Sequence, residues 1–313
     1  MRVTTKMLTS ALLNNINNNL SKLQEYENQL SSHVKVDKAS DNPVAAAKIL
    51  KAKSALKSQD QYSTNMEYAS GLLETVDGAL ASVDDVLLRA RGITVSGSTG
   101  TTTTDSMQAL ADEVDGLIGE MVQVANTDYN GSYVFAGGET SAAPFTTIPE
   151  SGTNVTEVNF ITSDPLLLDE TYSQKVEIAS GVTIDISAGR TTFHTGTDGQ
   201  DDINSVFQTM IKLRDSLKAG DQAAVSALLS DIDAQTDNVI SERAVVGAKS
   251  NRIELAQNRA ETYNISLTTL ISNLEDADYA EAAALYSSQQ AVYEASLLVG
   301  AKIIQPSLLD FLR

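Results

Sequence analysis

Hydrophobic residues recur at alternating steps of three and four in four separate segments of the chain. This is the spacing of helices that pack through a narrow apolar seam. The first seam has Leu13, Ile16, Leu20, Leu23, Leu30 and Val34; the second has Leu73, Val76, Leu80, Val83 and Leu87; the third has Leu110, Val114, Leu117, Met121 and Val124. The fourth runs through Ile253, Ala256, Ala260, Tyr263, Leu267, Leu270 and Leu274, and it resumes after a phase break at Tyr279, Ala283, Tyr286, Gln290, Tyr293 and Leu297. The pattern predicts long amphipathic helices, including one at each end of the chain.

Capping residues mark where these helices start. Asn42 followed by Pro43 is typical of an N-cap and a first helical residue. Asp105 with Gln108, and Asp278 with Glu281, have capping-box spacing, and the second pair lies at the phase break. The Gly-, Ser- and Thr-rich segment 96–106 predicts the tip of a helical hairpin, and Gly220 with Asp221 predicts a stop and restart.

The hydrophobic period changes towards two after Gly131, which favours strands. Val182, Ile184 and Ile186 alternate with polar residues, and they follow a Ser-Gly pair at 180–181 that predicts a hairpin turn. A helical pattern returns near Ile203. We therefore expect a small β-rich insert over residues 131–196.

The fold class predicted from this pattern is mainly α, an elongated antiparallel helical bundle or coiled coil with a small β-rich insert domain. Five segments follow along the chain: an N-terminal assembly arm (1–60), a helical hairpin of the rod (61–130), the insert (131–196), returning rod helices (197–250) and a C-terminal assembly arm (251–313). The 5% aromatic content, with no Trp, fits the thin interior of a helical bundle.

Charge excludes some partners. The net charge of −19 argues against nucleic acid and against an acidic membrane surface, because both bind through Lys and Arg. The charge is uneven, since residues 1–60 carry nine basic and five acidic residues whereas the remainder carries 13 and 36. This asymmetry fits either a solvated surface or the pairing of terminal segments in an assembly.

The sequence contains no catalytic signature. There is no Cys, and the two histidines, His33 and His194, lack the spacing of a zinc site. Phosphate-binding, calcium-binding and nucleophile-elbow motifs are absent, as are the Glu-x-x-His pairs of a carboxylate-bridged metal enzyme. We expect no cofactor, no metal and no enzymatic activity. We also expect no cleaved signal peptide and no membrane anchor, because no apolar stretch has the required length or flanks.

Three ordered motifs resemble the flagellin superfamily. They are RVTTKML at the start, LSSHVKVDKASDNPVAAAKI at residues 30–49, and NLEDADYAEAAALYSSQQAVYEASLLVGAKIIQPSLLDFL near the end. The segment 130–145, NGSYVFAGGETSAAPF, is similar to an element of the family's hook-filament junction branch that flagellins generally lack. Its motif residues here are Phe135, Ala136, Gly137, Thr140, Pro144 and Phe145.

The resemblance implies a structural subunit that is exported through the flagellar type III channel and lies outside the cell at the hook-filament junction. Its implied partners are copies of itself in a ring, hook-associated protein 1, flagellin and an export chaperone. The implied assembly residues are Leu13, Ile16, Leu20, Leu23, Leu30, Ser40, Asp41, Asn42, Pro43, Leu267, Leu270, Leu274, Tyr286, Tyr293, Leu297, Ile304, Leu308 and Leu309. A filament-forming flagellin and a cytosolic coiled-coil adapter are the alternatives.

Three positions depart from the family's pattern. The family has Gly where His33 stands, a basic residue where Val34 stands and Asp where Asn42 stands. Gly at the end of a helix provides a left-handed stop, a conformation that His tolerates better than β-branched residues do. The chain around His33 is therefore expected to run differently from that of the family, while Asn42 still caps Pro43.

Overall fold

The protein is described by a computed structural model covering residues 5–100, 103–136, 141–149, 155–160, 174–187, 190–193 and 206–311. Helices dominate it: α1 (Thr5–Ser32), α2 (Pro43–Gly97), α3 (Thr104–Ala125), α4 (Arg190–Phe193), α5 (Val206–Ala219), α6 (Gln222–Glu275) and α7 (Tyr279–Phe311). The chain divides into two compact units, which we describe separately: unit 1 is residues 1–58 with 262–313, and unit 2 is residues 59–261. The predicted mainly α fold is confirmed.

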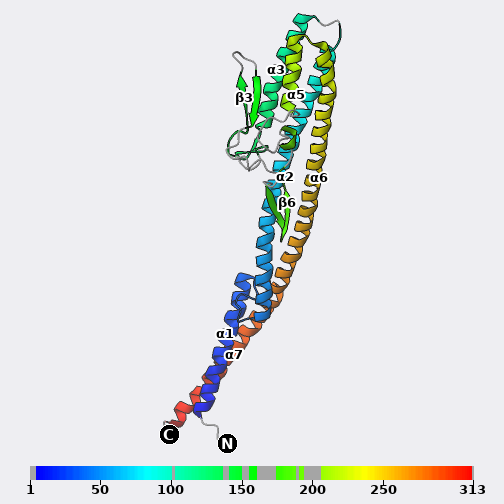
Figure 1. Cartoon of the computed structure of the whole chain (residues 1–313). Coiled ribbons are helices and arrows are strands. Elements are labelled where there is room, and N and C mark those ends of the chain that lie inside the picture. Colours follow the sequence, from blue (N-terminus) through cyan, green and yellow to red (C-terminus); the bar gives the residue numbers. More distant parts are fainter. Residues whose placement is uncertain are drawn as a thin grey trace. The chain divides into compact units, whose positions relative to one another are not determined.

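Unit 2 is built from long helices that lie alongside one another (Figure 1). The seam predicted on α2 is confirmed, because Leu73, Leu80 and Leu87 are fully buried together with the valines between them. On α3, Val114 and Met121 are buried as predicted, but Ala111, Ile118 and Ala125 are buried too. The stripe is wider than a two-helix seam because α3 packs against α5 as well as against the core of α2.

Ion pairs tie the helices of unit 2 together. Arg91 of α2 meets Asp233 of α6 at 2.6 Å. The side chain of Arg214 on α5 is buried, and it binds Asp115 of α3 at 3.0 Å and the neighbouring Asp215 at 2.7 Å. Burial by itself lowers the pKa of Arg214, but the hydrogen bonds to the two carboxylates outweigh it and raise that pKa. This guanidinium therefore stays charged inside the α3–α5 contact.

Among the described residues, three antiparallel hairpins lie in or next to the insert: β1 (Asp128–Tyr129) with β2 (Ser132–Tyr133), which begins just before it, β3 (Phe145–Pro149) with β4 (Val155–Phe160), and β5 (Lys175–Ala179) with β6 (Val182–Asp185). The first turns through Asn130 and Gly131, both at positive φ, as an Asn-Gly hairpin does. The last turns at Gly181 with φ 72°, which confirms the predicted hairpin.

Hydrogen bonds fasten the hairpins to the helices. The Asn126 side chain, just after α3, accepts from the backbone N–H of Phe145 at 3.0 Å and donates to its carbonyl at 2.8 Å. Asn65 of α2 donates to the carbonyl of Glu177 at 2.9 Å. Lys249 of α6 donates to the carbonyl of Ser187 at 2.6 Å. The insert is therefore part of unit 2 and packs on its helices.

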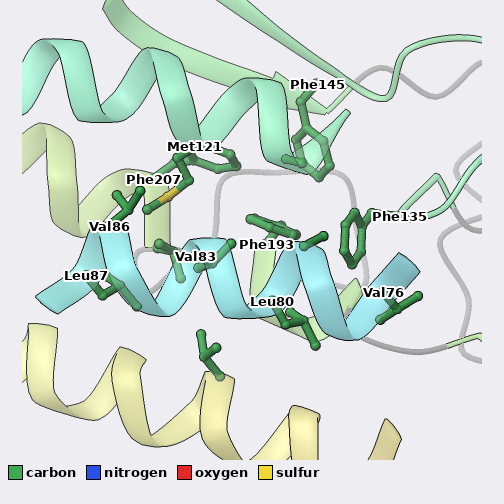
Figure 2. Close-up of a cluster of buried hydrophobic side chains, with 14 of the residues drawn as sticks. Val76, Leu80, Val83, Val86, Leu87, Met121, Phe135, Phe145, Phe193 and Phe207 are labelled. Carbon is green, nitrogen blue, oxygen red and sulfur yellow. The ribbon is translucent and has the colours of Figure 1, made fainter. Parts of the chain in front are cut away.

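Four phenylalanines form the core under the insert. Figure 2 shows Phe135, Phe145, Phe193 and Phe207 gathered over the face of α2 that carries Val76, Leu80 and Val83. The ring centroids of Phe193 lie 4.9 Å from Phe135, 5.6 Å from Phe145 and 5.7 Å from Phe207. These separations are typical of attractive aromatic pairs, so the cluster joins the insert to the helices by packing.

Helix boundaries agree with most of the predicted caps. Asn42 Oδ1 accepts from the N–H of Ala45 at 3.0 Å, and α2 begins at Pro43 as predicted. Asp278 Oδ1 accepts from two N–H groups at the start of α7. The prediction for Asp105 is wrong, since α3 is capped by Thr103, whose hydroxyl accepts from Ser106. Thr103 has the extended backbone that an N-cap needs, whereas Asp105 lies inside the first turn.

Unit 1 contains α1 and α7 together with the near ends of α2 and α6. α6 ends at Glu275 and α7 starts at Tyr279, so the predicted phase break is a real break between helices. Within the residues that the structure describes, no helix has a stretch long and apolar enough to cross a membrane.

Candidate assembly surface

Helices α1 and α7 pair antiparallel in unit 1 (Figure 1). Towards the chain ends, Gly300 lies against Leu12, and a Cβ built on Gly300 would sit 3.1 Å from a methyl carbon of Leu12. Further along, Asn19 donates to Ser296 Oγ at 2.9 Å. At the far end, the ring of His33 stacks on that of Tyr279 with centroids 5.8 Å apart. The absence of a side chain at Gly300 lets the two helices approach closely.

A polar layer crosses the middle of this pair. Gln289 Nε2 donates to the Asn19 carbonyl at 3.2 Å and to its side-chain oxygen at 3.3 Å, and Asn19 in turn donates to Ser296. A single polar layer in a coiled coil specifies register at the expense of stability. The layer therefore fixes how α1 lies along α7 while leaving their contact weak.

The predicted seam of α1 is correct at every second position and wrong by one residue at the others. Ile16, Leu23 and Leu30 are half-buried, as predicted, but Leu13 and Leu20 are exposed. Leu12 and Asn19, each one position earlier in the chain, take their places, and Tyr26 continues this row seven residues after Asn19. The hydrophobic pattern missed this because Asn19 enters the seam through hydrogen bonds.

The C-terminal helices also differ from the predicted seam by one residue, earlier in the chain on α7 and later on α6. On α7, Tyr286 and Tyr293 are half-buried as predicted, whereas Leu297 is exposed and Ser296 takes its place. On α6, Leu267 is buried and Leu274 half-buried, but Leu270 is exposed and Ile271 is half-buried instead. Side chains at Ile304, Leu308 and Leu309 lie outside the described part of the structure. Four leucines that were predicted to pack therefore lie on the solvent side of unit 1: Leu13, Leu20, Leu270 and Leu297.

An apolar row on α7 stays partly exposed among the described residues. Leu285, Val292 and Val299 are spaced seven apart and are 40%, 46% and 52% exposed. Residues seven apart lie on one side of a helix. Leu298, adjacent to the row, is 68% exposed. A patch of large apolar side chains on a helix marks an interaction site; we refer to Leu285, Val292 and Val299 as the α7 row.

Backbone hydrogen bonds hold the turn that follows α1; we refer to this turn, residues 33–35, as the joint. His33 has φ 61°, a left-handed conformation, and its N–H donates to the carbonyl of Gln29 at 2.9 Å. Its own carbonyl accepts from the N–H of Ala277 at 3.0 Å, and the N–H of Lys35 donates to the carbonyl of Glu275 at 2.6 Å. These bonds hold the turn after α1 against the α6–α7 break.

The loop between the joint and α2 is organised by its own side chains. Asp41 Oδ2 accepts from the N–H of Lys38 at 2.9 Å, and Ser40 Oγ donates to the other carboxylate oxygen at 3.3 Å. The bond from Lys38 lowers the pKa of Asp41. Ser40, Asp41, Asn42 and Pro43 are all exposed, so these predicted assembly residues shape the loop and start α2 without being buried.

The predicted family motif belongs to the core of unit 2. Phe135, Ala136, Pro144 and Phe145 are buried, whereas Gly137 and Thr140 fall outside the described residues. The prediction missed Phe193, and it placed Phe207 on a returning helix without pairing it with the motif. No spacing in the sequence could join them, because the four rings come from segments that the fold brings together.

Over the described residues, no group of three or more His, Cys, Asp or Glu side chains could hold a metal ion. His194, the other histidine considered from the sequence, lies outside them.

Both ends of the chain match one family. Residues 3–140 match the bacterial flagellin N-terminal helical region, and residues 229–312 match the bacterial flagellin C-terminal helical region. The chain belongs to the flagellin superfamily. The two matches include almost all of α1 and α7, so the α7 row and the joint lie within the family's shared regions.

Curated relatives match over nearly the whole length. Flagellar hook-associated protein 3 of Escherichia coli K12 is 25% identical over 95% of both chains, and that of Salmonella typhimurium LT2 is 24% identical over 95% of both. A flagellin of Bacillus subtilis 168 is 24% identical over 95% of this chain and 94% of its own. The relatives are thus named as components of the flagellum.

Solved structures have the same fold. A putative flagellar hook-associated protein from Vibrio parahaemolyticus aligns with a TM-score of 0.62 at 21% identity, covering 75% of this chain and all of that one. Flagellar hook-associated protein 3 from Legionella pneumophila aligns with a TM-score of 0.58 at 14% identity, covering 72% and 98%. At these identities the likeness establishes the fold.

Proposed function

We propose that this chain is a structural subunit of the bacterial flagellum at the hook-filament junction, where copies form a ring that joins hook-associated protein 1 to the flagellin filament. The observation that carries the proposal is the α7 row, a partly exposed apolar face on the terminal helix pair of a flagellin-superfamily chain. Two relatives matched over 95% of their length are named flagellar hook-associated protein 3. Export without signal cleavage, with an export chaperone, accompanies this role.

The energetics support assembly through unit 1. Burying a Val or Leu side chain completely stabilises by about 1.5–3 kcal/mol. Since the three residues of the α7 row are already 48–60% covered, closing the remainder contributes about 1 kcal/mol each. The α1–α7 contact is weakened by its polar layer, so the pair gains stability when a neighbouring subunit covers it.

A filament-forming flagellin is the second candidate, because the Bacillus subtilis flagellin matches this chain over nearly the same length. Phe135 and Phe145 favour the junction protein. They belong to the motif of the junction branch, and both rings are buried in the core beneath the insert. A flagellin would need no such element in this position.

Deletion of the gene separates the two candidates. We expect electron microscopy of the deletion strain to show complete hooks without filaments, and an immunoblot to show flagellin released into the medium. Hooks that carry complete junction rings but lack filament subunits would make the chain the flagellin. Unaltered flagella would contradict both.

Substitutions in the α7 row test the surface itself. Val292→Asp combined with Val299→Asp places two charges where apolar contact is proposed, and it is expected to abolish filaments while the purified chain keeps its helical circular dichroism. The matched control is Ser287→Asp with Ser288→Asp, which adds the same charge to exposed polar positions of α7. Normal filaments in the valine variant would refute the assembly role of this row.

A further inference from the structure

The solvent side of α2 in unit 1 combines apolar and basic residues. Val44 and Leu50 are 66% and 68% exposed, more than most large hydrophobic side chains of this chain. Lys48, Lys51 and Lys57 are also exposed. None of the three lysines makes an ion pair with a described residue, whereas Lys53 on the same helix pairs with Glu275 at 2.6 Å. They form two rows on the solvent-facing half of the helix, Val44 with Lys48 and Lys51, and Leu50 with Lys57, and we refer to these five residues as the basic α2 face.

Charge is divided sharply between the two units. Unit 1 contains 11 basic and 10 acidic residues, a net charge of +1. Unit 2 contains 11 basic and 31 acidic residues, a net charge of −20. Like faces of unit 2 repel one another, so a contact between copies that involves unit 2 is favoured where it meets a basic surface of the other copy. The basic α2 face is such a surface.

A row of carboxylates lies further along α2. Asp60, Glu67 and Glu74 are spaced seven apart, so they lie along one side of the helix, and all three are exposed. None of them makes an ion pair within the described part of the chain, in contrast to Asp77, which binds Arg243 at 3.0 Å. Unpaired lysines at one end of α2 and unpaired carboxylates further along it give one molecule both halves of a contact.

We propose that the basic α2 face of one copy docks on the carboxylate row Asp60, Glu67 and Glu74 of a second copy. The inference rests on the proposed function, in which copies assemble into a ring. Because the two surfaces are different patches of the same chain, the contact is heterologous, and a heterologous contact closes into a ring when its rotation permits. Val44 and Leu50 supply apolar contact, and the lysines set the orientation and speed of docking.

Disulfide cross-linking tests the contact, and no native cysteine can form a competing disulfide, because the chain has none. Two variants are needed, Lys57→Cys with Glu67→Cys and Lys57→Cys with Glu74→Cys. Positions 57 and 67 lie about 15 Å apart along one helix, and 57 and 74 lie further apart, so neither pair can form a disulfide within one copy. Mild oxidation of isolated flagella is expected to give a ladder of covalent oligomers in at least one variant. The control Lys57→Cys with Gln123→Cys, whose second site is exposed on α3, should give none.

Charge reversal provides an independent readout. Lys51→Glu with Lys57→Glu, and separately Glu67→Lys with Glu74→Lys, should each lower the number of filaments per cell about tenfold. Combining all four substitutions should restore it, because the contact is re-formed with opposite signs. The control Lys175→Glu with Lys218→Glu lowers the net charge of the chain by the same amount as Lys51→Glu with Lys57→Glu, but at other sites. It should have little effect on the number of filaments.

The outcomes separate this inference from the proposed function. Flagella that require the gene but give neither a ladder nor a charge-reversal effect would overturn the α2 contact and leave the junction role intact. Flagella that assemble normally without the gene would overturn the junction role itself. A ladder that also forms with the Gln123 control would show unspecific contact and would likewise overturn the proposal.

Discussion

A methyl group placed on Gly71 would collide with the first hairpin of the insert. Gly71 lies in α2, and a Cβ built on it would sit 2.2 Å from Tyr129 Oη, 2.9 Å from Cζ and 3.3 Å from Cε2. Ordinary van der Waals contact begins near 3.4 Å, so the tyrosine ring has to move by about 1 Å. That ring also packs against Tyr68, with centroids 5.7 Å apart.

Gly78 gives the matched control. It lies seven residues further along α2, and a Cβ built on it has nothing within 4 Å. Replacing a helical Gly by Ala stabilises by about 1 kcal/mol through backbone entropy, and both substitutions gain this amount. Overpacking costs about 1–3 kcal/mol, and only Gly71→Ala incurs it. The free energy of unfolding should therefore be about 1–3 kcal/mol lower for Gly71→Ala than for Gly78→Ala.

Urea unfolding followed by circular dichroism measures this difference directly. The slopes of the two variants should agree, so that the midpoints compare stability alone. Equal free energies of unfolding for Gly71→Ala and Gly78→Ala would refute the argument, because they would mean that Tyr129 does not hold the hairpin against α2.

Three further predictions follow from contacts already described. Gly300→Leu should separate α1 from α7 and speed hydrogen exchange in α1, whereas Ala301→Leu on the exposed side should not; equal exchange would contradict the close approach. Arg214→Met should lower the free energy of unfolding by about 2 kcal/mol. This is less than the loss of a fully buried ion pair, because the carboxylate partners of Arg214 keep some exposure. An unchanged urea midpoint would contradict this prediction. The pKa of Asp41 is lowered in the folded chain, so its carboxylate stabilises the loop above about pH 4, and this contribution is lost as pH falls through the folded pKa. Amide exchange at Lys38, corrected for intrinsic rates, should therefore quicken only in that acid range. In Asp41→Asn the corrected exchange should not depend on pH there.

Much of the helical framework was predictable because local signals and packing agree. Asn42 before Pro43 caps and starts a helix by local chemistry alone, and Gly220, at φ 72°, ends one by its own conformational freedom. On α2 the seam from Leu73 to Leu87 is buried as predicted, because apolar side chains there meet other apolar side chains.

The faces of the terminal helices were harder to predict. A hydrophobic pattern chooses Leu13 over Leu12 and Leu297 over Ser296, but the structure packs the second member of each pair. Polar side chains such as Asn19 enter the seam by bonding across it, and hydrophobicity does not register this. An apolar residue outside the seam is the signal of a second contact, and it can be recognised only after the first contact is known.

The aromatic core was beyond prediction for a different reason. Phe135 and Phe193 lie 58 residues apart in the chain, yet their ring centroids are 4.9 Å apart. No period in the sequence connects a strand-like segment with the four-residue helix that carries Phe193. Such contacts depend on how the hairpins fold over α2, which is a property of the whole unit.

The position of the protein on the flagellum tests the central claim most directly. A short epitope inserted after the exposed residue Ser141 can be located by immunogold electron microscopy on intact flagella of cells that remain motile. The account predicts gold particles only at the boundary between hook and filament. Labelling along the whole filament, or labelling confined to the cytoplasm, would contradict it.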